Sequence, residues 1–157
     1  MGGGIIITAL SETGVTPNGD TGPDYLDKKT VYDHSDLDMT ITQDVGHVGD
    51  TIRFKIKNSS ESLVDLGCNI PWALQRRSSG EWKHVTWTPQ RTIDLCFSSV
   101  GPEDTTTVDV PMSVSALNDI HDVSEVRTNL VPGDYRFILL GPDPQLATDF
   151  QLLPSDT

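Results

Sequence analysis

Strict alternation of apolar and charged side chains in residues 50–58, DTIRFKIKN, is the feature that most constrains the fold. Ile52, Phe54 and Ile56 are apolar, and a basic residue follows each of them. Successive side chains of a strand point to opposite faces, so this period marks a strand with one buried and one solvated face. Residues 37–42 repeat the pattern, and we predict a pair of antiparallel strands.

Short β-prone segments separated by Gly, Pro, Asn and Ser continue toward the C-terminus. About eight such strands predict an all-β fold, an antiparallel β-sandwich. One short helix is expected within residues 113–126, where Leu117 and Ile120 form an apolar stripe. The expected strands lie at residues 37–45, 50–58, 63–67, 71–77, 82–87, 91–97, 105–112, 134–140 and 148–153.

The first 36 residues differ from the rest and are expected to form an extended N-terminal arm, with the sandwich at 37–157. A β-prone run is followed by a stretch rich in Gly, Pro, Asn and Asp without sustained periodicity. This run either folds back as the first strand or adds to an exposed sheet edge of a neighbour. Its apolar residues are Ile5, Ile6, Ile7 and Leu10.

Four segments in order resemble the bacterial and archaeal immunoglobulin-like domains: IRFKIKNSS, WALQRRSSGEWKHV, GPEDTTTVDVPM and LVPGDYRFIL. The resemblance covers roughly residues 37–153, and its most specific parts are Gly80–Trp82 and Leu130–Arg136. It implies an immunoglobulin-like sandwich. Because export-associated and inhibitor-like domains share this layout, it implies a fold more than a role.

Four residues of these segments have a structural interpretation of their own. Leu130 is expected to enter the core, and the hydroxyl of Tyr135 to bond an upstream backbone group as a tyrosine corner. Gly80 permits a positive φ in a hairpin turn, and Trp82 is expected to cover one edge of the core.

Cys68 precedes the predicted strand at 71–77 and Cys96 lies at the end of the one at 91–97, and these strands can lie near each other in a sandwich. They are a disulfide candidate, which would place the protein outside a reducing cytosol. The alternative is two buried thiols.

The chain is strongly acidic, with 23 Asp and Glu against 11 Lys and Arg and a formal charge of −12. Such a surface repels phosphate, so a nucleic-acid partner is not expected. Abundant Asp and Thr with few Lys indicate adaptation to high salt. We find no apolar stretch of membrane-span length and no recognisable secretory signal, and we expect cytoplasmic synthesis followed by an extracellular or virion location.

Basic residues concentrate in residues 51–91, which hold seven bases and three acids, whereas the flanking segments are acidic. The alternation places several of these basic residues at outward-facing strand positions. This predicts a basic docking face on an otherwise acidic protein. Its partner is either the protein's own acidic segments or an acidic neighbour such as another copy. The residues of this docking face are Arg53, Lys55, Lys57 and Arg77.

Catalytic and metal-binding patterns are not recognised. The four histidines are scattered, and neither a nucleophile elbow nor a phosphate loop is present, so we expect no enzyme, no catalytic residue and no cofactor. Asp-rich loops at residues 18–24 and 33–38 contain oxygen ligands, but they lack EF-hand spacing and are interpreted as turn-forming residues, with no metal expected.

These features favour a non-enzymatic assembly module of an extracellular particle, namely a virion capsid-decoration or tail component, or a surface-filament subunit. Its partners would be other copies or neighbouring subunits. The alternative is a secreted or lipid-anchored accessory domain that recognises a protein or a glycan, with an inhibitor-like domain as one version. A calcium-dependent adhesion domain is a third hypothesis.

Overall fold

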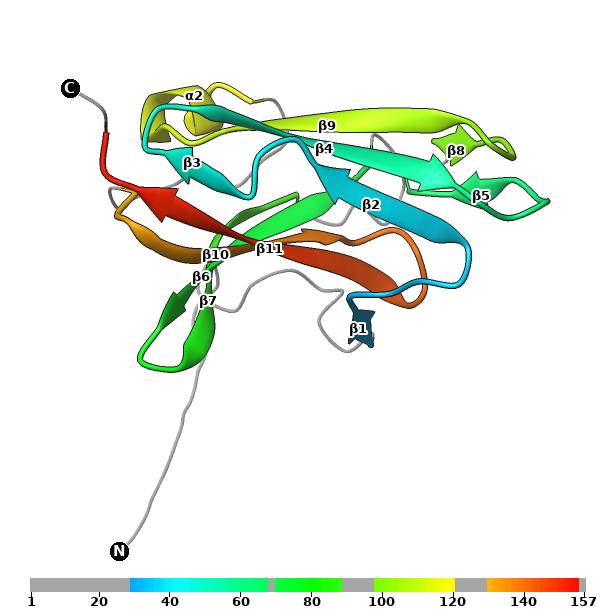
Figure 1. Cartoon of the computed structure of the whole chain (residues 1–157), viewed down its shortest axis with the longest axis horizontal. Helices are drawn as coiled ribbons and strands as arrows, with labels where there is room; N and C mark the ends of the chain where they lie inside the picture. The colour runs from blue at the N-terminus through cyan, green and yellow to red at the C-terminus, as the bar shows by residue number, and fades with distance from the viewer. Residues whose placement is uncertain (1–28, 68–69, 89–97, 121–129, 156–157) are drawn as a thin grey trace, which may run out of the picture.

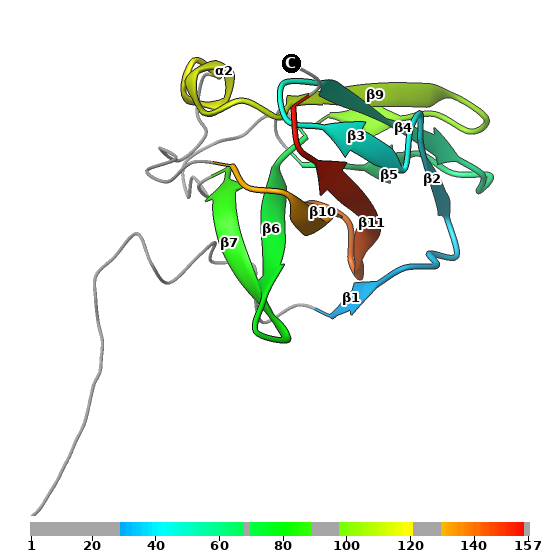
Figure 2. The same cartoon turned by 60° about the vertical axis from the view of Figure 1, so that its left-hand side comes forward.

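The computed structural model describes residues 29–67, 70–88, 98–120 and 130–155, and this part of the chain is nearly all β. Two main sheets pack against each other, as Figures 1 and 2 show. The all-β class predicted from the alternation is therefore confirmed.

The larger sheet has six strands in the order β1-β11-β10-β6-β7, with β3 also on β11. Strands β1 and β3 pair in parallel with the two ends of β11, and the other pairs are antiparallel. The bounds are β1 Thr30–Val31, β3 Val45–His47, β6 Trp72–Ser78, β7 Glu81–Trp87, β10 Gly133–Leu139 and β11 Gln145–Leu153.

The smaller sheet has the antiparallel order β2-β4-β9, and a further pair joins β5 to β8. The one described helix, α2, begins after the N-cap Ser113 and buries Leu117 completely. The predicted strand at 91–97 lies outside the described residues. The bounds are β2 Leu37–Ile41, β4 Thr51–Asn58, β9 Thr105–Pro111, β5 Val64–Asp65, β8 Ser99–Val100 and α2 Val114–Asn118.

The core lies between the two main sheets. Burial alternates along β4, where Ile52, Phe54 and Ile56 are fully buried. The Phe54 ring stacks on Phe137 of the facing sheet, with ring centroids 4.0 Å apart. Burial of such large apolar side chains is the main favourable contribution to folding.

The two main sheets face each other with the strand orders β2-β4-β9 and β11-β10-β6-β7, which is the arrangement of a β-sandwich. Leu130 is in the core cluster. The Tyr135 hydroxyl donates to the carbonyl oxygen of Val131 at 2.6 Å, the upstream bond expected of a tyrosine corner. Membership of the immunoglobulin-like family stays a prediction.

The boundary expected between residues 36 and 37 falls inside packed structure. Strand β1 belongs to the segment expected to be arm, yet it pairs with β11. The hydroxyl of Tyr32 donates to Asp149 on the same strand at 3.0 Å. Residues 30–36 are therefore part of the sandwich, because β11 presents an edge that β1 completes.

Candidate functional site: the outer face of the six-stranded sheet

The bases of β4 form a row on the outer face of the smaller sheet, but most of that row is neutralised. Arg53 makes a two-point ion pair with Asp109 on β9, at 2.8 and 3.1 Å. Lys57 lies 3.3 Å from Glu103. Lys55 faces threonines on both neighbouring strands, and no carboxylate of the described residues lies within ion-pair distance of it.

Arg77 does not belong to this row, so the four bases of the predicted docking face lie on two different sheets, while their docking role stays a prediction. Arg77 is exposed on β6 and lies on the outer face of the six-stranded sheet, on the opposite side of the sandwich. Alternation distinguishes inward from outward side chains. It does not say which of two sheets carries an outward one.

Trp82 is also placed differently from the prediction, since it lies on this outer face rather than at an edge of the core. The turn at Ser79 and Gly80 has positive φ at both residues and pairs Arg77 with Trp82. Directly opposite residues share a face of an antiparallel sheet, so Trp82 points outward with Arg77.

Arg136 of β10 is the centre of a hydrogen-bonded network on this face. Its guanidinium lies 4.6 Å from the Trp82 ring centroid and donates twice to the side-chain oxygen of Gln75, at 2.8 and 2.6 Å. It also donates to the Tyr32 hydroxyl at 3.2 Å. The network therefore joins β7, β6, β10 and the segment after β1, and it holds the Trp82 ring in place.

His84 lies beside Gln75 at the β7 end of the network. The Gln75 amide nitrogen is 3.3 Å from Nε2 of His84, and the imidazole packs edge-on to Trp87. Burial, together with the charge of Arg136, lowers the pKa of His84 to about 4. The imidazole is therefore neutral at physiological pH and has one nitrogen free to accept the Gln75 N–H.

A groove of about 440 Å³ crosses the same face from β3 to β7. It spans five strands, or roughly 19 Å at the usual strand spacing. Carboxylates, an amide, a guanidinium and an indole contribute to its wall, and Val45 at one end is 44% exposed. The lining residues are Asp44, Val45, Arg77, Trp82, Asp134, Asp149, Phe150 and Gln151.

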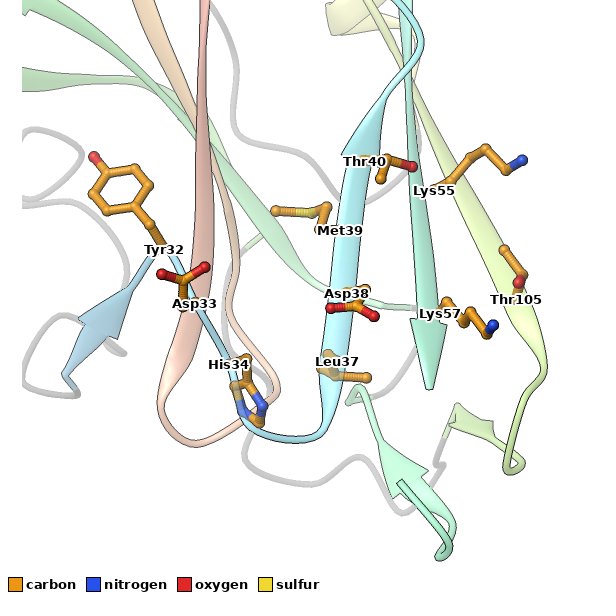
Figure 3. A pocket seen from close by; sticks show the side chains of 10 residues that line it. All are labelled: Tyr32, Asp33, His34, Leu37, Asp38, Met39, Thr40, Lys55, Lys57 and Thr105. Atoms are coloured by element: carbon orange, nitrogen blue, oxygen red, sulfur yellow. The ribbon is translucent and has the colours of Figure 1, made fainter. Parts of the chain in front are cut away.

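A second hollow, of about 430 Å³, lies along β2 and the segment that follows β1. Figure 3 shows Tyr32 and Met39 on one side of β2, whereas Lys55 and Lys57 extend to the other. The Nε2 atom of His34 is buried, and no group of the described residues forms a hydrogen bond with it. Because its polar groups do not converge on a common point, we regard this hollow as the weaker candidate site.

The arm and the two cysteines, which were also predicted as sites, lie outside the described residues. The residues concerned are Ile5, Ile6, Ile7 and Leu10 of the arm, and both Cys68 and Cys96. The described residues contain no group of three or more His, Cys, Asp or Glu side chains that could hold a metal ion. In the same residues, no helix has the length and apolarity that a membrane crossing requires.

The aromatic and arginine network was not predicted from sequence, although one signal for it was present. A two-residue turn at Ser79–Gly80 places Arg77 opposite Trp82, and an outward Arg77 therefore implies an outward Trp82. The contacts of Arg136 and Tyr32 carry no such local signal, because they join strands far apart in the chain.

No protein-family model and no curated protein matches the chain. Among solved structures, it resembles part of a β-glucosidase from Listeria innocua in complex with isofagomine, at TM-score 0.41 and 15% identity over 76% of this chain and 16% of that chain. It also resembles part of the alkylpurine DNA glycosylase AlkC of Pseudomonas fluorescens, at TM-score 0.37 and 14% identity over 74% of this chain and 30% of that one. The chain spans less than a third of either protein, and similarity this low carries no argument about function.

Proposed function

We propose that the chain is a non-enzymatic assembly module of an extracellular particle in a high-salt environment, either a virion component or a surface-filament subunit. One face of the sandwich contacts neighbouring subunits, and the opposite face is displayed for recognition. The observation that carries this proposal is the different chemistry of the two outer sheet faces.

The outer face of the smaller sheet suits contact with a neighbouring subunit. Its charges are mostly paired in place, as Arg53 is with Asp109, so little charge must be desolvated without a partner. Lys55 at the middle of the row supplies one charge for an acidic group of the neighbour. Charge pairs of this kind set the register and the partner of an interface more than its affinity.

The outer face of the six-stranded sheet suits recognition. Trp, Tyr and Arg are the residue types that dominate binding energy at interfaces. Here Trp82, Arg136 and Tyr32 are already held by contacts with one another. Groups ordered before binding lose less conformational entropy when a ligand arrives.

Light scattering coupled to size-exclusion chromatography of the full chain in molar salt tests the assembly role. We expect oligomers whose population rises with protein concentration and falls in Lys55→Glu. The matched control is Lys83→Glu, which makes the same charge change on the exposed β7 hairpin and should leave assembly unchanged. A monomer at every concentration and salt level would contradict the proposal.

The second candidate, a secreted or lipid-anchored accessory domain, is favoured by the groove across the six-stranded sheet. A monomeric chain that still binds a ligand in that groove would support it over the assembly role.

A further inference from the structure

We propose that the groove across the outer face of the six-stranded sheet binds a neutral glycan, with Trp82 as the stacking platform. This inference rests on the proposed role as a recognition module displayed outside the cell. It adds the chemical class of the ligand and the residues that contact it.

Trp82 has the position and the rigidity that a stacking platform requires. The indole lines the groove and is partly exposed, and the guanidinium groups of Arg136 and Arg77 lie 4.6 and 5.9 Å from its ring centroid. Arg136 is in turn fixed by two bonds to Gln75, which is only 4% exposed. The ring is therefore held by a half-buried arginine that is itself fixed to a buried side chain, and it can offer its uncovered surface to the apolar C–H face of a sugar.

The polar groups beside the platform match the hydrogen-bonding pattern of sugar hydroxyls. A hydroxyl both donates and accepts. Asp134 and Asp149 offer acceptors, Arg77 offers a donor pair, and the amide of Gln151 offers both. Because these side chains lie in a row on neighbouring strands, they can contact successive rings of an extended oligosaccharide.

Charge argues for a neutral ligand. Three carboxylates line the groove, those of Asp44, Asp134 and Asp149, whereas Arg77 is the only base among the lining residues. Sulfated, phosphorylated or uronic-acid chains would meet like charge on a molecule that already carries −12.

A protein partner fits this groove less well. The centre of a protein interface is depleted in Asp and rich in apolar surface. Here the exposed apolar groups, Val45 and Trp82, lie at the two ends, and the middle is polar. The hydroxyls of a sugar can replace the water that hydrogen-bonds these polar groups, whereas an apolar side chain would remove that water and supply no hydrogen bond in its place.

NMR titration of the ¹⁵N-labelled full chain in molar salt tests the inference. The probes are neutral hexasaccharides of glucose (α-1,4 and β-1,4), mannose and N-acetylglucosamine, with a heparin hexasaccharide as the anionic comparison. We expect saturable shifts at Trp82 Nε1–H and at Asp134 and Gln151 with at least one neutral probe. Trp82→Ala should weaken that binding about tenfold or more, and Trp82→Phe less.

Lys55→Gln is the matched control, since it alters the opposite face and should leave glycan affinity unchanged. A thermal melt of each variant checks that the fold is retained. Binding unaffected by Trp82→Ala, binding of heparin alone, or no shift with any neutral probe at millimolar concentration overturns the inference. None of these results changes the light-scattering test of assembly, so the two proposals can fail separately.

Discussion

Tyr135 anchors the start of β10 through one short hydrogen bond to the Val131 carbonyl. The side chain is completely buried, and burial raises the pKa of its hydroxyl, which therefore remains a donor. Tyr135→Phe should lower the free energy of unfolding by about 0.5–1.5 kcal/mol, measured by urea denaturation. Tyr32→Phe is the control, because Tyr32 is 51% exposed and water can replace its partners, so a smaller loss is expected. Equal losses would contradict the role of burial.

His84 makes stability depend on pH. Its folded pKa of about 4 lies below the value of 6.5 in the unfolded chain, so the unfolded state takes up the proton first as pH falls. The free energy of unfolding should therefore be insensitive to His84 above about pH 7.5 and should decrease as pH drops from 6.5 toward 4. Urea unfolding across this range measures the effect, and an NMR titration of the imidazole measures the pKa directly.

His84→Gln is the comparison for this pH dependence, because it removes the imidazole and leaves every carboxylate of the chain in place. Between pH 6.5 and 4 the free energy of unfolding should fall further in the wild type than in the variant. The difference arises because the unfolded wild-type chain binds about one proton more, at His84, than the folded protein does. Parallel pH profiles would show that His84 is protonated equally in both states.

At the scale of elements, the connection between β10 and β11 packs directly on the connection between β5 and β6. A Cβ atom on Gly141 would overlap the backbone carbonyl of Leu66. Gly141→Ala should destabilise by about 3 kcal/mol or more, since neither backbone can move alone. Gly101→Ala is the matched control, because its Cβ would approach the Asp104 carboxylate to 2.9 Å, and this side chain can rotate away, whereas Leu63 lies at an ordinary contact distance of 3.9 Å. Similar unfolding midpoints for the two variants would contradict this packing.

Individual strands could be predicted because period two is a local signal. The side chains of β4 are alternately exposed and buried along the whole strand, as its sequence indicates. The short strands β1 and β3 were not predicted as separate strands, because each pairs with β11 more than a hundred residues away. A two-residue strand has too few side chains to show a period, and only its partner makes it a strand.

At the scale of the molecule, the two outer faces could not be separated from sequence. Arg53 and Arg77 both occupy outward-facing positions of their strands, yet these strands belong to different sheets. Which sheet a strand joins is decided by pairing across the whole chain, here β6 with β10 and β4 with β9. The groove needs five strands in their final order, so its residues come from β3, β11, β10, β6 and β7 and share no motif.

Net charge is a property of the whole molecule, and it predicts that stability depends on salt. The formal charge is −12, and the described ion pairs are few and exposed, as Arg53 with Asp109 illustrates. At low ionic strength the surplus carboxylates repel one another over tens of ångströms, whereas at about 1 M salt the screening length is only about 3 Å. The thermal midpoint should therefore rise steeply with KCl, and the chain should lose structure on transfer to dilute buffer.

Sucrose separates screening from a general stabilisation of the compact state, because it strengthens burial by exclusion from the surface and screens no charge. We expect the melting temperature at low ionic strength to recover far less in sucrose than in KCl of equal osmolality. Replacing several exposed Asp residues by Asn should flatten the KCl dependence, since fewer charges then need screening. A melting temperature that is the same in dilute buffer and in molar KCl would contradict adaptation to high salt, and with it the extracellular high-salt setting of the proposed function.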